Sequence, residues 1–149
     1  MSYLISSINY CPVKSLSFQS IESCEIKKNL GILNDRIFAF SRIVDSKKAQ
    51  LIEKNPNERN LNNFLTLKNS PVLNKYDFNY KDNKLTLTFD GKELISISPN
   101  DIEQRSLLTK RLIELESSLI KPISLLKNKE FPFYDTSHSD KVFNSISLI

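Results

Sequence analysis

The stretch LTLTFDGKELISI, residues 85–97, has the clearest local pattern in the sequence. Leu85 and Leu87 alternate with threonines, which is the period of a strand with one buried face. Asp90 and Gly91 then suit a two-residue hairpin turn, because both central positions of that turn favour positive φ. Apolar residues alternate again on the return, so the stretch predicts an antiparallel β-hairpin.

Outward from this hairpin, shorter runs of apolar and β-branched residues predict further strands. These runs are residues 3–10, 18–28, 36–45, 76–80 and 121–126. Pro12 ends the regular pairing of the first strand, because proline has no amide hydrogen to donate. Gly31 lies in a predicted turn, where it can adopt a positive φ.

The pattern changes to a helical period after Pro99. Asn100 is the expected N-cap, and Glu103 follows it at the spacing of a capping box. Leucines then recur at helical spacing and predict a helix, residues 101–119, whose apolar face packs on the core. These leucines are Leu108, Leu112, Leu115 and Leu119.

The order of the elements predicts an α+β fold. We expect a small β-rich barrel or a curled antiparallel sheet, with one main helix packed on it. The polar segment 46–63 has no clear period and predicts a long surface loop, with a short helix around residues 58–64.

Composition limits the classes of function. The 149 residues carry a formal net charge of +4, which suits a small anionic ligand or solubility as well as it suits nucleic acid. No run approaches the roughly 20 apolar residues of a membrane span, and the N-terminus lacks the pattern of a signal peptide. A cytoplasmic protein is therefore expected. With only two glycines, the common glycine-rich phosphate loops are excluded.

Residues for metal or nucleophilic chemistry are few. Without export, Cys11 and Cys24 are expected to be reduced. A transition-metal site is hard to assemble around a single histidine, His138. His138 has Asp135 nearby, but a catalytic triad is defined by geometry and not by proximity in the sequence. No catalytic residue and no metal ligand is predicted.

Four residues are candidates for binding an anion. Lys14 and Ser15 follow the first strand, Arg36 opens the third strand, and Lys68 precedes Pro71. Two or three cations with a hydroxyl group suit a phosphate, because charge-assisted hydrogen bonds are about twice as strong as neutral ones. The alternative is that each residue is an ordinary solvated surface group.

Several motifs together resemble one protein family. INYCPVKSL (8–16), GILNDRIFAF (31–40) and FLTLKNSPVL (64–73), ahead of the DNKLTL hairpin, are similar to the N-terminal β-barrel domain that precedes the MOSC domain. MOSC denotes the C-terminal domain of molybdenum cofactor sulfurases, and the same pair of domains forms the mitochondrial amidoxime-reducing component. The resemblance covers about residues 3–135.

The resemblance implies a binding role for the candidate residues. In the two-domain proteins the molybdenum cofactor, a molybdopterin, lies between the barrel and the MOSC domain. The lysine, serine and arginine of the matching motifs contact its pterin and phosphate side, and they correspond to Lys14, Ser15 and Arg36. Lys68 stands where the family usually has an arginine, which keeps the charge but loses the bidentate fork.

The resemblance also implies how the chain is organised. Residues 1–135 correspond to the barrel domain, and residues 136–149 resemble the start of a truncated MOSC domain. The cysteine that binds molybdenum belongs to the MOSC domain, and neither Cys11 nor Cys24 matches it. We expect a MOSC domain as the partner, either as a continuation or as a separate chain. Intact relatives reduce N-hydroxylated compounds or transfer sulfur to the cofactor, so an electron-transfer protein is a further expected partner.

Two alternatives stay open. One is a small barrel that binds nucleic acid, which would need exposed aromatic rings on a basic face. The phenylalanines and tyrosines here fall mostly at strand positions with core-like alternation, so nucleic acid is not an expected partner, and neither is a membrane. The other is a structural or interaction module, in which the apolar residues 146–149 form a strand that pairs with another sheet edge.

Overall fold

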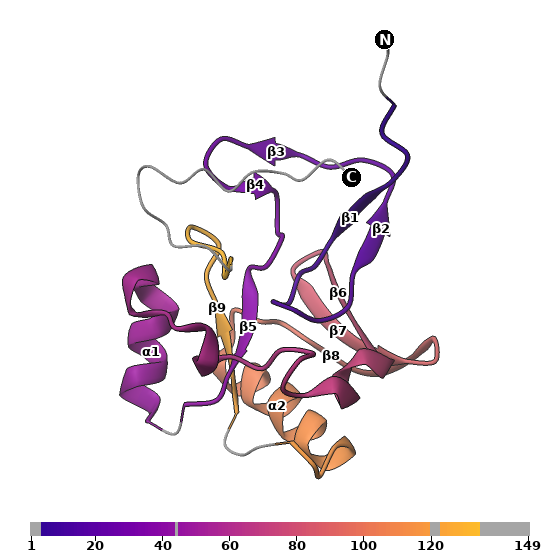
Figure 1. The fold of residues 1–149 in the computed structure, drawn as a ribbon. Coiled ribbons are helices and arrows are strands. Elements are labelled where there is room, and N and C mark those ends of the chain that lie inside the picture. Colours follow the sequence, from indigo (N-terminus) through magenta and orange to yellow (C-terminus); the bar gives the residue numbers. More distant parts are fainter. Residues whose placement is uncertain (1–3, 44, 120–122, 135–149) are drawn as a thin grey trace.

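The computed structural model describes residues 4–43, 45–119 and 123–134 (Figure 1). Within these ranges the chain has nine short strands and two α-helices, which confirms the α+β class. In chain order the strands and helices are β1 (Ile8–Tyr10), β2 (Gln19–Ile21), β3 (Ile26–Lys27), β4 (Gly31–Ile32), β5 (Phe38–Ser41), α1 (Ser46–Lys54), β6 (Tyr76–Lys81), β7 (Lys84–Phe89), β8 (Lys92–Ile97), α2 (Ile102–Leu115) and β9 (Ser124–Lys127). Short 3-10 turns occupy Pro56–Glu58, Leu61–Asn63 and Pro71–Lys75.

The hairpin predicted from residues 85–97 belongs to a three-stranded antiparallel sheet in the order β6-β7-β8 (Figure 1). Both of its turns contain two residues at positive φ: Asp82 and Asn83 at 51° and 58°, and Asp90 and Gly91 at 49° and 71°. These backbone angles match the twist that two-residue hairpins require. The predicted hairpin at Asp90 and Gly91 is therefore confirmed, with a shift of register between Leu87 and Thr88.

Helix α2 packs its leucine face on this sheet. Leu108 and Leu112 are completely buried in the main core, together with side chains of β6 and β7. The N-cap is Asp101 and not the predicted Asn100, because the Asp101 carboxylate accepts hydrogen bonds from the amides of Glu103 and Gln104. The helix ends at Leu115, one turn before the predicted end.

A second helix corrects the prediction of one main helix. The segment 46–63 was expected to be a surface loop with a short helix near residues 58–64, but α1 occupies its first half and two 3-10 turns follow. Asp45 caps α1 by accepting a hydrogen bond from the Lys47 amide at 2.9 Å. Ala49 and Ile52 are buried against β9 in a small second core. The helix was not predicted because two buried residues are too few to give a clear helical period in the sequence.

Strand β5 is the central element of the fold. All four of its residues are buried, and it pairs with β9 in antiparallel orientation. Phe38, its first residue, also forms a parallel bridge with Val13. Ser41, its last residue, forms an antiparallel bridge with Phe64. The described strands fall into four separate small sheets, so the curled-sheet form of the prediction is confirmed and the closed barrel is not formed.

The N-terminal strands are shorter than the sequence pattern suggested. The predicted strand at 3–10 forms only β1, and the predicted strand at 18–28 is divided into β2 and β3, which pair with different neighbours. The proposed second domain at 136–149 and the residues around His138 lie outside the described residues.

Candidate functional site

The two motifs of the family resemblance lie side by side. The Arg36 amide donates to the Cys11 carbonyl at 2.6 Å, and the Phe38 amide donates to the Pro12 carbonyl at 3.0 Å. The Lys14 amide donates in return to the Phe38 carbonyl at 2.8 Å. The turn after β1 thus extends along the start of β5 as a short parallel pair, which places the Lys14–Ser15 turn and the Asp35–Arg36 turn on neighbouring segments.

Asp35 holds the two turns in this arrangement. Its carboxylate accepts a hydrogen bond from the Cys11 amide and pairs with the Arg36 guanidinium, both at 2.8 Å. Burial raises the pKa of the Asp35 carboxyl, although the Cys11 amide and Arg36 both favour its charged form. Asp35 is thus a positioning residue that orients Arg36.

Ser15 and Arg36 both adopt left-handed backbone conformations. Their φ values are 57° and 51°, in a region that residues other than glycine seldom occupy. Such conformations cost of order 1 kcal/mol each and cluster at binding sites, where the surrounding structure enforces them. Both side chains are half-buried, and the Arg36 guanidinium lies 5.6 Å from the centre of the Tyr134 ring.

The sequence allows two roles for Lys14, a phosphate ligand and a solvated surface charge. It fits neither of them simply, because it is only 1% exposed. Its ammonium group donates to the Phe133 carbonyl at 3.1 Å and lies 5.8 Å from the centre of the Phe64 ring. Lysine is rarely buried without partners. Lys14 is therefore neither a solvated surface charge nor an openly presented ligand; it lies beneath residues 131–134.

Lys68 is not part of this cluster. It is exposed in a turn that follows Phe64. Among the hydrogen bonds and ion pairs of residues 4–43, 45–119 and 123–134, none joins Lys68 to Lys14, Ser15 or Arg36. The structure thus places three of the four predicted residues on neighbouring segments.

The sequence analysis missed the segment that covers this site, residues 131–134. The Phe133 amide donates to the Arg36 carbonyl at 2.8 Å, which continues the pairing beside β5. Arg59 stacks on the Phe133 ring at 4.1 Å and donates to the carbonyls of Phe131 and Pro132. A lone arginine in an asparagine-rich segment gives no periodic signal, so these contacts could not be predicted.

Described side chains offer little for catalysis. Burial raises the pKa of the Cys11 thiol to about 11, so this thiol stays protonated at neutral pH and is a poor nucleophile. Cys11 and Cys24 are both free, as expected. No group of three His, Cys, Asp or Glu side chains within the described ranges is placed to hold a metal ion.

No protein-family model, curated protein or solved structure matches the chain. The resemblance to the MOSC-associated barrel therefore rests on its sequence motifs. In the part of the chain that the structure describes, neither helix has the length and apolar content needed to cross a bilayer.

Proposed function

We propose that this chain is the N-terminal module of a MOSC-type molybdenum-cofactor protein, and that its Lys14–Ser15 and Asp35–Arg36 turns bind the phosphate and pterin side of the cofactor. The observation that supports this function is the backbone pairing of these two turns. Residues that are distant in the sequence thereby form one cluster with two cations and a hydroxyl group.

Arg36 fits the role of phosphate ligand best. Its side chain is 30% exposed, and its Nη1 atom is fixed by the Asp35 carboxylate. A guanidinium has five N–H donors, so one ion pair leaves others to bind an oxyanion. Ser15, half-buried in the neighbouring turn, supplies a hydroxyl group that we propose as a second donor to the cofactor.

Lys14 contributes in a different way from the other two residues. Because its ammonium group lies under residues 131–134, it acts as a buried positive charge and does not contact the cofactor directly. Charges interact more strongly across a protein interior than across water, so this position still favours an anion above it. Lys68 lies outside the cluster and has no part in this proposal.

The cofactor supplies the molybdenum centre and its redox chemistry when it is bound in the intact relatives. In this proposal the present chain orients the cofactor, and the MOSC domain supplies the metal ligand. Arg36 and Ser15 hold the anionic end, Asp35 keeps Arg36 in place, and residues 131–134 exclude water from Lys14. The chain by itself is expected to have no turnover.

Nucleic-acid binding is not favoured by the arrangement of the aromatic rings. Most described phenylalanines and tyrosines are buried, and some of them pack edge to face, as in the pairs Phe38–Tyr80 and Phe40–Phe78. Binding of single strands depends on exposed rings on which bases stack.

The test is reconstitution with a MOSC domain. The chain is co-expressed with the MOSC domain of an amidoxime-reducing component, and molybdenum and oxidised pterin are measured in the purified complex. We expect a complex that retains both. Arg36→Gln should lower retention about tenfold, because it removes one charge-assisted contact.

Arg111→Gln is the matched control, since Arg111 is a partly exposed arginine on α2 that pairs with Glu114 at 3.4 Å. Urea unfolding of each variant shows whether it remains folded. The proposal is refuted if no complex forms, or if folded Arg36→Gln and Arg111→Gln retain the cofactor equally.

A further inference from the structure

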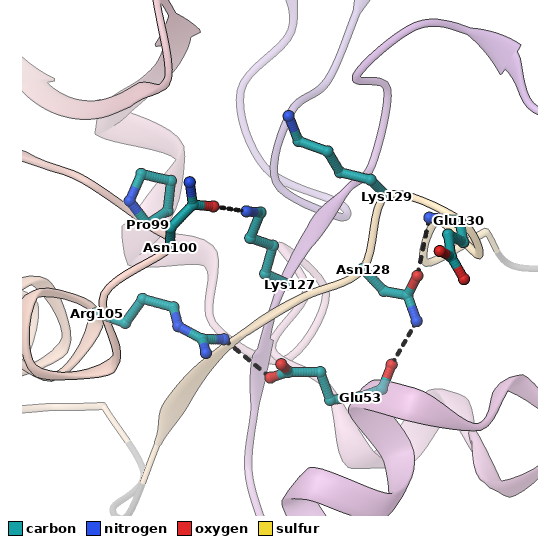
Figure 2. Close-up of a pocket in the computed structure, with 8 residues that line it drawn as sticks. All are labelled: Glu53, Pro99, Asn100, Arg105, Lys127, Asn128, Lys129 and Glu130. Carbon is teal, nitrogen blue, oxygen red and sulfur yellow. Dashed lines mark hydrogen bonds and ion pairs between the residues drawn. The ribbon is translucent and has the colours of Figure 1, made fainter.

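A second cluster of cations lines an open pocket of about 390 Å³ at the end of β9, and none of its residues belongs to the site described above (Figure 2). Four parts of the chain meet there: the end of β9 with the residues after it, the loop before α2, the start of α2, and the last turns of α1. The lining residues are Glu53, Pro99, Asn100, Arg105, Lys127, Asn128, Lys129 and Glu130. Pockets that hold small ligands start at about 300 Å³, so the volume is sufficient for one.

Arg105 forms the floor of this pocket with its acidic partner. Its Nη1 atom pairs with the Glu53 carboxylate at 2.9 Å and also donates to the Leu125 carbonyl at 3.3 Å. Its Nε–H group is buried and has no hydrogen-bond partner among the described residues. Because this Nε–H group is buried, a ligand in the pocket would meet the positive charge of Arg105 and not this donor.

Lys127 and Lys129 place two further positive charges on one side of the pocket (Figure 2). The Lys127 ammonium donates to the Asn100 side chain, and the Lys129 ammonium lies 5.3 Å from the centre of the Tyr80 ring. Burial lowers the pKa of Lys127, and the nearby charges of Lys129 and Arg105 lower it further.

The acidic residues neutralise only part of this positive charge. Glu53 is engaged by Arg105, and Glu130 is exposed at the rim. The lining carries three cations and two carboxylates, which leaves an excess of one positive charge. Asn100 and Asn128 add amide groups that can donate to an oxyanion.

We propose that this pocket binds the phosphoryl group of a small phosphate monoester. Lys127 at the end of β9 and Lys129 in the segment after it contact the phosphoryl oxygens, Asn100 donates from the loop before α2, and Arg105 adds positive charge beneath them. A tetrahedral group suits donors that converge from three elements, whereas a planar carboxylate would meet only one side of them. The inference is independent of the proposed cofactor function, because the two sites share no residue.

The experiment is a titration of the full chain followed by amide NMR, at constant ionic strength maintained with sodium chloride. Inorganic phosphate, ribose 5-phosphate and acetate are titrated separately. We expect both phosphate compounds to shift the amides of residues 100–105 and 127–130, with a dissociation constant of about 1 mM for inorganic phosphate. Tighter binding of ribose 5-phosphate would identify an ester as the ligand, and equal binding would identify the free ion.

Variants connect the binding to the lysines. Lys127→Gln should weaken phosphate binding about tenfold, because it removes one charge-assisted contact, and the double variant with Lys129→Gln should abolish it. Lys92→Gln is the matched control, since Lys92 is an exposed lysine at the far end of β8. It should bind as the unmodified protein does.

Any one of three results would overturn the proposal. The first is the absence of phosphate-dependent shifts in the pocket amides up to about 20 mM, well above the expected dissociation constant. The second is a response to acetate equal to the response to phosphate, and the third is a Lys127→Gln variant that binds phosphate as tightly as Lys92→Gln does. Lys127 is half-buried and Lys92 is exposed, so neither Lys127→Gln nor Lys92→Gln is expected to unfold the chain.

Discussion

Replacing Arg59 by alanine should release the segment 131–134 from the body of the protein. The Arg59 side chain donates to the carbonyls of Phe131 and Pro132 at 2.8 and 2.9 Å, and to those of Ile52 and Glu53 at 3.1 Å each. It thus joins the end of α1 to the segment that covers Lys14. Burial lowers the pKa of Arg59 to about 10, so the guanidinium is charged at neutral pH.

The expected loss in the free energy of unfolding is about 3 kcal/mol. Water can reach several of the four carbonyls in the variant, so each lost hydrogen bond counts for about 0.5 kcal/mol, the low end of the usual range. Removal of the stacking on Phe133, at 4.1 Å, adds about 1 kcal/mol. Arg59→Lys should lose about 2 kcal/mol, because an ammonium group cannot make the same fork of bonds.

The assay is urea unfolding followed by circular dichroism. Arg111→Ala is the matched control and should lose less than about 0.5 kcal/mol, because its ion pair with Glu114 is largely exposed. Hydrogen exchange of the Phe133 amide should become faster in Arg59→Ala, since its bond to the Arg36 carbonyl loses support. A loss no larger than that of Arg111→Ala would refute the role assigned to Arg59.

Three further changes test the core, a buried ion-pair network and a turn. Leu112→Ala removes a completely buried side chain and should lower the free energy of unfolding by about 3 kcal/mol in a urea titration. Desolvation raises the pKa of Glu116, but hydrogen bonds from Lys75 and Tyr76 outweigh it and the pKa is lowered. The stability that Glu116 contributes is therefore present above its ordinary pKa of 4.5 and lost as the pH falls through the lower folded value. Tyr76→Phe removes one of these hydrogen bonds, so the free energy of unfolding should depend less on pH. Urea unfolding curves at pH values around and below 4.5 measure this. Gly31→Ala should cost about 1–2 kcal/mol by thermal unfolding, because φ is +74° there.

Each of these changes has a control within the chain. Leu107→Ala, on the exposed side of α2, should cost less than about 0.5 kcal/mol. Tyr80→Phe removes a hydroxyl group that bonds to Asn83 and no carboxylate, so the acid limb of the stability curve should not change. Gly91→Ala has a similar φ of +71° and open space around it, so its cost isolates the backbone effect. A Leu112→Ala variant as stable as Leu107→Ala would contradict the assigned packing.

Local patterns in the sequence predicted the β6–β8 sheet and the α2 helix well. Their residues repeat over several turns or strand positions, and Asp90 and Gly91 fix the hairpin by backbone chemistry. The α1 helix was missed because only Ala49 and Ile52 of its nine residues are buried. Its stability comes from packing on β9, which is distant in the sequence.

The sequence determined the elements whose information is local: the hairpin at residues 85–97, the leucine face of α2 and the positive φ at Gly31. It also marked Lys14 and Arg36 as residues worth testing. Tertiary structure alone decided that Lys14 is buried against Phe133. It also placed Arg105, Lys127 and Lys129 around one pocket. The physical reason is that burial and electrostatic environment depend on which distant segments pack together, and a residue's neighbours in the sequence do not specify those segments.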